Sequence, residues 1–258
     1  MKNALIGHSG FIGKNIKKIR KFHVLYNSKN INKIKKKNFN IVFCCGLPSL
    51  MWKANKYPIR DLNNVLKLTK NLSTISCKKF ILISSVEIYD HRFSNTEKKF
   101  VFKKNKLSYG YNRLFFEKFV ESKFSNVLIL RMPVIYGKYL KKNILYDIIN
   151  LNNLSNINLE DQLQFYNIKN IFKDIKIFNN KKINKINLVS APIKVKKLIK
   201  ILRPELIEKC KKDIKKARKY NIKSIHSRHF RSSNNYIISK KSALLDIIRF
   251  YNSQKNNK

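Results

Sequence analysis

Three polar residues in the first half of the chain have the types and spacing needed to move a proton. Ser85 closes an apolar run, and Tyr109 and Arg113 lie four residues apart in a segment with helical character. A tyrosine hydroxyl is a poor base because its reference pKa is about 10. A cation one helical turn away lies on the same face and favours the phenolate, and a nearby serine can hydrogen-bond the reacting oxygen. The three residues fit a general acid/base centre, although ordinary packing explains them equally well when they are taken alone.

A glycine-rich turn near the N-terminus is typical of a phosphate-binding loop. Gly7, Gly10 and Gly13 follow an apolar run at 4–6 and open a segment with helical spacing. In this context the backbone N–H groups that start the helix can approach a pyrophosphate. The first glycine allows the tight turn, the second the approach of the phosphates, and the third close packing of helix on strand. A tight turn without a ligand is the alternative.

The end of the second predicted strand bears on the choice of dinucleotide. A site selective for NAD usually places Asp or Glu there to bind the ribose hydroxyls. This chain has Asn27, Ser28 and Lys29 instead, and no acidic residue occurs before Asp61. Because no anion repels a 2′-phosphate and a lysine lies near, the site tolerates NADP. The sequence therefore slightly favours NADP over NAD. Compositional drift that removed the acid would carry no such meaning.

Apolar runs alternate with helical patterns along the chain. Strand-like runs lie at 4–6, 22–26, 40–45, 80–83, 126–130 and 186–189, and helical patterns at 15–19, 61–73, 109–122, 140–151, 168–178 and 239–251. Near-continuous apolar strands between helices predict a parallel sheet covered on both faces. The expected fold class is therefore α/β, with a Rossmann-type doubly wound parallel sheet.

The chain has 258 residues, with 57 Lys and Arg against 14 Asp and Glu, which gives a formal net charge of +43. Such a charge suggests nucleic acid, which rewards cations through counterion release. The lysines are spread over the chain, however, and accompany many Asn and Ile, which A/T-rich codons also encode. Drift in an A/T-rich genome explains the charge better, so nucleic acid is not the expected partner. The densest basic block, Lys209 to Lys219, is interpreted first as a solvated helix face and second as a phosphate patch.

Several classes of protein are excluded by composition. The hydrophobic content of 43% argues against wholesale disorder. No apolar run approaches the roughly 18 residues that a membrane helix needs, and the sequence predicts no signal peptide. The four cysteines form neither a disulfide framework nor a CxxC pair. We expect a cytoplasmic protein without a membrane partner or a metal site.

Together the motifs resemble the extended short-chain dehydrogenase/reductase family, the NAD(P)-dependent sugar-nucleotide epimerases, dehydratases and reductases. The resemblance rests on Gly7-x-x-Gly10-x-x-Gly13, Ser84-Ser85-Val86-x-x-Tyr89, Tyr109-Gly110-x-x-Arg113 with Glu117, and Arg131-x-Pro133-x-x-Tyr136-Gly137. It implies an NAD(P)-binding Rossmann core at 1–137. Residues 138–258 would combine the remaining core elements, at 164–191, with a small C-terminal substrate-binding cap. The implied activity is epimerisation or reduction of a nucleotide-activated sugar.

The resemblance also implies a role for each matching residue. Tyr109 would be the general acid/base, Ser85 would bind the substrate oxygen, and Arg113 would replace the family lysine that holds the nicotinamide ribose. The cofactor would contact Gly7, Ser9, Gly10, Phe11, Ile12, Gly13, Asn27, Ser28, Cys45, Gly46, Leu47, Tyr109, Arg113 and Pro133. The substrate would contact Ser85, Val86, Glu87 and Asn143. A homodimer built on the 109–122 helix and its neighbour is implied as well.

Two alternatives stay open beside the enzyme. The family pattern has Lys where this chain has Arg113, and a planar guanidinium is not geometrically equivalent to an ammonium. A catalytically silent NAD(P)-binding sensor or scaffold is therefore the second hypothesis. A basic nucleic-acid-binding protein is the third.

Overall fold

The computed structural model describes residues 1–102, 108–230 and 234–255. The chain forms two compact units. The first contains Met1–Asp90, Val101–Met132 and Lys169–Ile186, and the second contains His91–Phe100, Pro133–Ile168 and Asn187–Lys258. The division expected from the sequence, a dinucleotide-binding core at 1–137 with its remaining elements at 164–191, stays a prediction.

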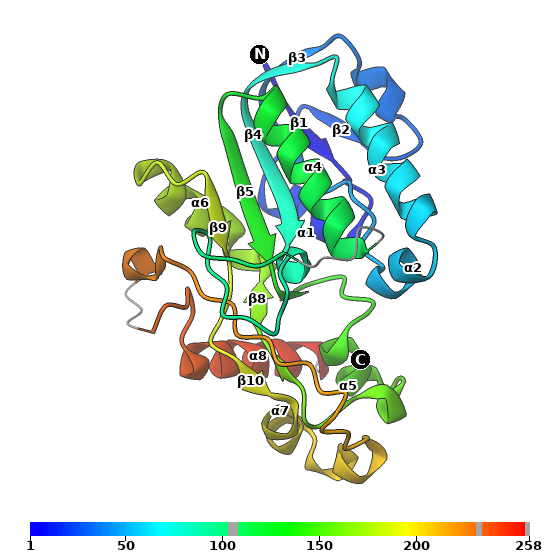
Figure 1. The fold of residues 1–258 in the computed structure, drawn as a ribbon, viewed down its shortest axis with the longest axis vertical. Coiled ribbons are helices and arrows are strands. Elements are labelled where there is room, and N and C mark those ends of the chain that lie inside the picture. Colours follow the sequence, from blue (N-terminus) through cyan, green and yellow to red (C-terminus); the bar gives the residue numbers. More distant parts are fainter. Residues whose placement is uncertain (103–107, 231–233, 256–258) are drawn as a thin grey trace. The chain divides into compact units, whose positions relative to one another are not determined.

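A six-stranded sheet forms the core of the first unit (Figure 1). In the order β2-β1-β3-β4-β5-β9, its strands are Val24–Tyr26, Lys2–Ile6, Asn38–Cys44, Ser76–Ser85, Val127–Met132 and Lys185–Asn187. The pairs formed among β1 to β5 are parallel. Because the chain passes from β2 across β1 to β3, the order reverses between β1 and β3. In open α/β sheets ligands bind at the carboxyl ends of the strands beside such a switch point.

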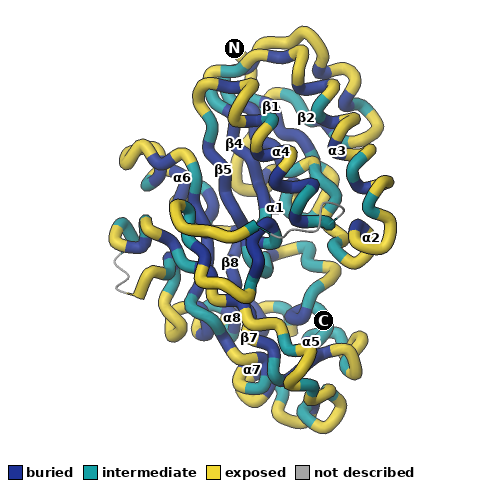
Figure 2. Tube along the Cα trace, viewed as in Figure 1, coloured by how far each residue is buried: buried dark blue, intermediate teal, exposed yellow. Residues whose placement is uncertain are grey.

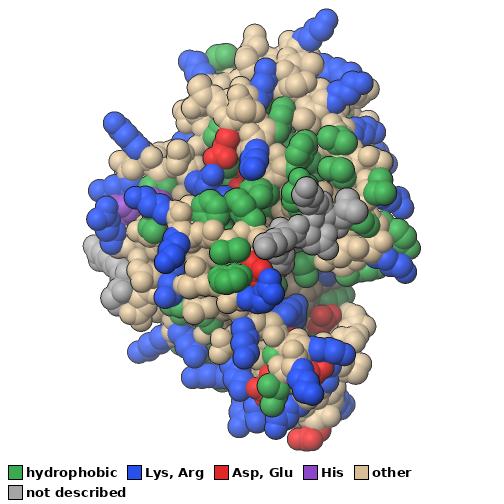
Figure 3. Space-filling view, viewed as in Figure 1, with side chains coloured by type: hydrophobic (Ala, Val, Ile, Leu, Met, Phe, Trp, Pro, Cys, Tyr) green, Lys and Arg blue, Asp and Glu red, His purple; other side chains and the backbone are tan. Residues whose placement is uncertain are grey.

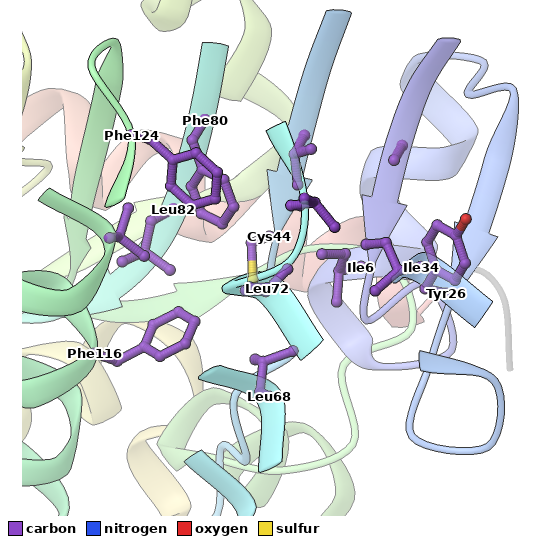
Figure 4. Packing of buried hydrophobic residues seen from close by; sticks show 14 of the residues in the cluster. Ile6, Tyr26, Ile34, Cys44, Leu68, Leu72, Phe80, Leu82, Phe116 and Phe124 are labelled. Carbon is purple, nitrogen blue, oxygen red and sulfur yellow. The ribbon is translucent and has the colours of Figure 1, made fainter. Parts of the chain in front are cut away.

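Helices cover both faces of this sheet, as the sequence predicts. They are α1 (Phe11–Ile19), α3 (Pro58–Leu72), α4 (Tyr109–Lys123) and α6 (Ile171–Asn180), while α2 (Met51–Lys56) packs against α3 and α4. Successive strand residues point to opposite faces. On one face Cys44, Phe80 and Leu82 pack against Leu68 of α3 and Phe116 of α4 (Figure 4). On the other face Phe43 contacts Phe172 of α6, with ring centroids 5.9 Å apart. Figure 2 shows the strands buried and the outer side of α3 exposed.

The second unit is built from short strands and helices. Its helices are α5 (Ile144–Asn150), α7 (Val195–Leu202) and α8 (Lys240–Lys255). Two small sheets pair β6 (Val134–Tyr136) with β8 (Phe165–Asn167) and β7 (Gln162–Leu163) with β10 (Ile193–Lys194). The sequence missed these strands because two or three residues carry no readable alternation. In the residues that the structure describes, no helix is both long and apolar enough to cross a membrane.

The interpretation of the basic block as a helix face is wrong. The block begins at the last residue of the 3₁₀ helix Pro204–Lys209 and is irregular from there to Lys219. Its backbone pairs with the 157–162 segment, since Lys211 N donates to Ile157 O at 3.0 Å and Gln162 N donates to Arg218 O at 2.8 Å. A helix here would also place like charges four residues apart, which is unfavourable.

Candidate active site

The glycine-rich turn joins β1 to α1 and is pressed against the ends of two neighbouring strands. Gly7 has φ +85°, and a Cβ there would lie 2.4 Å from the carbonyl oxygen of Cys45. Gly7 N donates to Tyr26 O at 2.8 Å, which ties the turn to the end of β2. The turn therefore lies at the carboxyl ends of β1, β2 and β3.

The other two glycines of this turn have different surroundings. A Cβ on Gly13 would lie 2.1 Å from Gly7 O, so close packing of α1 on the turn requires glycine there. Gly10 has φ −75°, and a Cβ there would meet only Gly7 O, at 3.5 Å. The apo fold therefore tolerates a side chain at Gly10. Gly10 caps α1 without a side-chain hydrogen bond, and Ser9 beside it is exposed. The first N–H groups of α1, those of Phe11, Ile12 and Gly13, form an uncapped helix start, a common anion site.

The end of β2 carries the residues expected to meet the ribose. Asn27 Oδ1 accepts from Lys29 N at 2.9 Å, and Asn27 Nδ2 lies 3.2 Å from His8 Nε2. Burial, and then the charge of Lys17, lower the pKa of His8, which favours its neutral form. Ser28 and Lys29 are exposed. The site has neutral donors and a lysine where an NAD-selective site would have a carboxylate.

The loop after β3 contains the residues predicted to follow the adenosine. Cys45 Sγ donates to Ile6 O at 3.1 Å, and burial raises the pKa of this thiol well above its usual range. A Cβ on Gly46 would lie 2.8 Å from Cγ2 of Ile6, so the loop lies flat on β1. Leu47 packs against the hydrophobic core. Cys45 is therefore an inert packing residue rather than a nucleophile.

Tyr109 begins α4, and three contacts fix the start of that helix. Ser108 Oγ accepts from Tyr111 N at 3.2 Å, and Asn55 Oδ1 accepts from Tyr109 N at 2.9 Å. A Cβ on Gly110 would lie 2.0 Å from Glu87 O, so the helix lies directly on the 3₁₀ turn Val86–Ile88. The Tyr109 hydroxyl itself forms no hydrogen bond with the described residues.

Ser85 immediately precedes that 3₁₀ turn, at the carboxyl end of β4. Its Oγ accepts from Glu87 N at 3.2 Å, which leaves the hydroxyl hydrogen available to another acceptor. The contact at Gly110 therefore brings the turn that bears Ser85 against the turn that bears Tyr109. Val86 is buried, and Glu87 is half-buried in the same turn.

Arg113 lies under Tyr109 and is almost fully buried. Its Nη1 and Nη2 donate to Asp61 Oδ2 and Oδ1, both at 3.0 Å, and Nη2 also donates to Pro48 O. Its guanidinium carbon lies 4.1 Å from the centre of the Tyr109 ring. Asp61 accepts a further bond from Asn112 Nδ2 at 2.8 Å. The cation thus contacts the ring face, and a buried carboxylate offsets its charge.

A second buried network supports the same region. Arg131 Nη2 donates to Glu117 Oε2 at 2.6 Å, and Arg131 Nη1 donates to Tyr89 Oη at 2.5 Å. Ser84 Oγ donates to Glu117 Oε1 at 2.5 Å. Burial lowers the pKa of Arg131, but Glu117 and Tyr89 raise it by more, so the group stays charged. The network joins β4, β5 and α4 and holds the carboxyl end of β4, where Ser85 lies.

The remaining predicted residues, Pro133 and Asn143, belong to the second unit. Asn143 caps α5, because its Oδ1 accepts from Leu145 N at 2.9 Å and from Tyr146 N at 3.2 Å. Its Nδ2 donates to Ile135 O at 2.8 Å. Their roles toward cofactor and substrate stay predictions. Among the residues described, no group of three or more His, Cys, Asp or Glu is arranged to hold a metal ion.

Sequence reasoning missed two residues of this site. One is Asp61 on α3, the partner of Arg113. The other is Asn55 on the preceding helix α2, which accepts a hydrogen bond from the Tyr109 amide. Asp61 carried one signal, because it is the first acidic residue of a strongly basic chain. Asn55 carried none, since asparagine is abundant throughout the sequence.

No protein-family model matches the chain. No curated protein matches it either. Solved structures do: MoeE5 in complex with UDP-glucuronic acid and NAD has a TM-score of 0.71 at 13% identity, with 99% of this chain and 100% of that chain covered. UDP-glucose 4-epimerase of Thermotoga maritima has a TM-score of 0.67 at 14% identity and 99% coverage of both chains. The dTDP-4-dehydrorhamnose reductase of Yersinia enterocolitica has a TM-score of 0.67 at 14% identity, with 98% and 100% covered.

These structures belong to extended short-chain dehydrogenases/reductases that act on sugar nucleotides. The chain has their fold over almost its whole length, which confirms the Rossmann-type architecture expected from the sequence. At this identity the likeness establishes the fold and leaves the reaction to be argued from the site.

Proposed function

We propose that this protein is an NAD(P)-dependent enzyme that epimerises or reduces a nucleotide-activated sugar. One observation carries the proposal: the contact of Gly110 with Glu87 O sets Ser85 and Tyr109 on adjoining turns. They lie at the same edge of the parallel sheet as the glycine-rich turn. A proton-transfer pair beside a dinucleotide turn, in a fold used by sugar-nucleotide enzymes, supports hydride transfer coupled to proton transfer.

The chain's own residues would bind and protonate the substrate. A bound nicotinamide supplies the site that accepts or donates the hydride. The uncapped start of α1 binds the pyrophosphate. Ser85 donates a hydrogen bond to the reacting sugar oxygen, and the Tyr109 hydroxyl exchanges a proton with the same oxygen. Arg113 supports the ring of Tyr109 from below and contributes positive charge, which Asp61 partly offsets.

The cofactor preferred in this proposal is NADP. Neutral Asn27 and Ser28 with the exposed Lys29 present no carboxylate to repel a 2′-phosphate. The first carboxylate of the chain, Asp61, is buried and paired with Arg113. A lower Kd for NADPH than for NADH, measured by quenching of intrinsic fluorescence, is the expected result.

The variant Gly10→Ala tests whether the glycine-rich turn binds a ligand or is only a structural turn. Since the apo fold has room for this Cβ, the thermal midpoint should stay unchanged. Crowding of the bound pyrophosphate should weaken NADPH by roughly 10- to 100-fold in Kd. The matched variant Gly13→Ala should lower the midpoint as well, because its Cβ would lie 2.1 Å from a backbone oxygen. A Gly10→Ala protein that binds NADPH like wild type would contradict a dinucleotide at this turn.

Turnover is tested directly with purified protein, NAD or NADPH and a panel of UDP- and dTDP-sugars, with products separated by anion-exchange chromatography. Identification of the nucleotide that co-purifies, by mass spectrometry, gives an independent reading of the cofactor. A silent dinucleotide-binding sensor is the second candidate, favoured by the pairing of Arg113 with Asp61. NADPH binding without turnover of any sugar nucleotide would support that candidate instead.

We further propose that the protein forms a homodimer through α3 and α4. These helices pack against each other and leave Ile59 65%, Leu66 42% and Phe115 37% exposed. Figure 3 shows hydrophobic side chains at the surface over α3 and α4. A second copy can cover such a face symmetrically, with the same patch on both subunits.

The four cysteines are free, which suits the reducing cytoplasm that we propose as the compartment of the protein.

Phe115→Glu should convert the dimer to a monomer in sedimentation velocity, because it buries a charge in the middle of the contact. Leu245→Glu is the control, since Leu245 is similarly exposed, at 46%, but lies on α8. A dimer that survives Phe115→Glu, or a wild-type protein that is monomeric, would refute this interface.

A further inference from the structure

The basic segment Lys209–Lys219, here called the basic loop, is held firmly although it contains no helix or strand after Lys209, which ends a 3₁₀ helix. Leu159 N donates to Lys211 O at 2.9 Å near one end, and Tyr220 N donates to Gln162 O at 3.0 Å beyond the other. Between them Asn158 Nδ2 donates to Asp213 O at 2.7 Å. These contacts lie within the second unit and give the loop a defined conformation.

Two buried side chains complete this support. Asn158 is 4% exposed, and its Oδ1 also accepts from Asp213 N at 3.1 Å. Asp161 is 1% exposed and forms an ion pair with Arg218, whose backbone N also donates to Asp161 Oδ1 at 2.7 Å. The buried side chains of Asn158 and Asp161 therefore support the inner side of the basic loop. The exposed side chains on its outer side are not needed for this support.

The outer surface combines an aliphatic side chain with lysines. Ile214 is 66% exposed. It begins a turn closed by Ala217 N donating to Ile214 O at 3.4 Å, and Lys216 N donates to Asp213 Oδ1 at 3.0 Å. The lysines on either side of Ile214 are all exposed: Lys211, Lys212, Lys215 and Lys216.

Neighbouring elements extend the positive surface. Lys194, Lys197 and Lys200 are exposed on β10 and α7, and β10 pairs with β7 directly after the segment that supports the loop. Figure 3 shows Lys and Arg gathered over α7 and its surroundings. Of the acids here, Asp161 is matched by Arg218, Glu160 by Lys194 and Glu205 by Arg203. Glu208 and Asp213 lie beside and within the loop, where the lysines outnumber them. The surface therefore keeps a strong positive charge around one exposed apolar residue.

We propose that the basic loop docks the protein on an anionic lipid bilayer, with Ile214 entering the headgroup region and the lysines facing lipid phosphates. Lysines near an anionic surface contribute about 1 kcal/mol each, and one aliphatic side chain adds a short-range apolar contact. Single-stranded nucleic acid is instead gripped by aromatic stacking and by Arg. The loop exposes no aromatic side chain, and its one arginine is committed to Asp161. This inference does not depend on the proposed enzymatic function.

Flotation with extruded vesicles tests the proposal. The protein should float with phosphatidylglycerol–phosphatidylcholine vesicles and not with pure phosphatidylcholine. Ile214→Ser keeps every charge and should weaken binding about tenfold. Neutralising the four lysines of the loop to Gln should weaken it by more than about 100-fold. The matched control neutralises Lys33, Lys35, Lys36 and Lys37, four exposed lysines of the first unit.

The control distinguishes binding by the basic loop from binding by the net positive charge of the whole protein. If both sets of four substitutions weaken binding equally, and Ile214→Ser has no effect, the net charge alone is responsible and the proposal is wrong. It is also wrong if the same variants lose a tighter complex with single-stranded RNA in a gel-shift assay. All substituted side chains are exposed, so unchanged thermal midpoints are expected and exclude misfolding as the cause.

Discussion

Replacing Tyr109 with phenylalanine should lower the turnover of a sugar-nucleotide substrate by about 100-fold or more, the usual contribution of general acid/base catalysis. The hydroxyl forms no hydrogen bond with the described part of the chain, and the ring would still lie on the guanidinium of Arg113. The substitution therefore removes the proton-carrying group and no hydrogen bond to the part of the chain that the structure describes. NADPH should still bind, and the thermal midpoint should stay at its wild-type value.

Tyr111→Phe is the matched control, since Tyr111 is half-buried on the same helical turn. It should retain wild-type turnover. The measurement is steady-state kinetics with whichever sugar nucleotide the wild type converts, together with NADPH titration of each variant. Equal kcat in wild type and Tyr109→Phe would refute the proton-transfer role while leaving the dinucleotide site intact.

The sheet and its main helices were readable from the sequence because their signals are local. The run at 4–6 became the end of β1, the run at 80–83 lies inside β4, and the 109–122 pattern became α4. Glycine was equally informative. In a chain with only six glycines, Gly7, Gly13 and Gly110 all lie where a Cβ would come within 2.4 Å of a carbonyl oxygen.

The contacts that shape the site could not be read in the same way. Arg113 and Asp61 are 52 residues apart, and only the packing of α4 against α3 brings them together. The sequence placed Arg113 one turn from Tyr109 correctly, but spacing along one helix says nothing about a carboxylate on the next. The prediction of a helix for the basic loop failed for a related reason. The conformation of the loop depends on the buried Asn158 and Asp161, which belong to another segment.

In this strongly basic chain the acidic residues indicate structural contacts better than the lysines do. Only 14 remain, and several occupy buried positions with more than one donor. Buried Glu117 binds Arg131 and Ser84, and half-buried Glu97 accepts from Ser224 Oγ at 2.6 Å and from Ile225 N at 2.9 Å. A carboxylate that persists against compositional drift therefore marks a place where a cation or several N–H groups require an anion.

Asp61→Asn should destabilise the fold strongly. It leaves Arg113 charged and buried without its counter-ion, which typically costs 3–5 kcal/mol, and in a protein of this size lowers the thermal midpoint by roughly 10 °C. Glu205→Gln is the control, because Glu205 pairs with Arg203 at the surface, where an ion pair contributes little. Differential scanning calorimetry of both variants measures the difference, and equal midpoints would contradict a stabilising role for the buried pair.

The double variant Asp61→Leu/Arg113→Met identifies the physical origin of that loss. If an unpaired buried charge causes it, removing both partners should restore part of the midpoint, since apolar replacement of a buried pair is often nearly neutral. The recovery should be incomplete, because Pro48 O and Asn112 Nδ2 each lose a partner. The same protein lacks a cation beneath Tyr109. A stable double variant that binds NADPH but turns over more slowly than wild type would show that Arg113 serves the tyrosine as well as the fold, whereas unchanged turnover would assign the pair to stability alone.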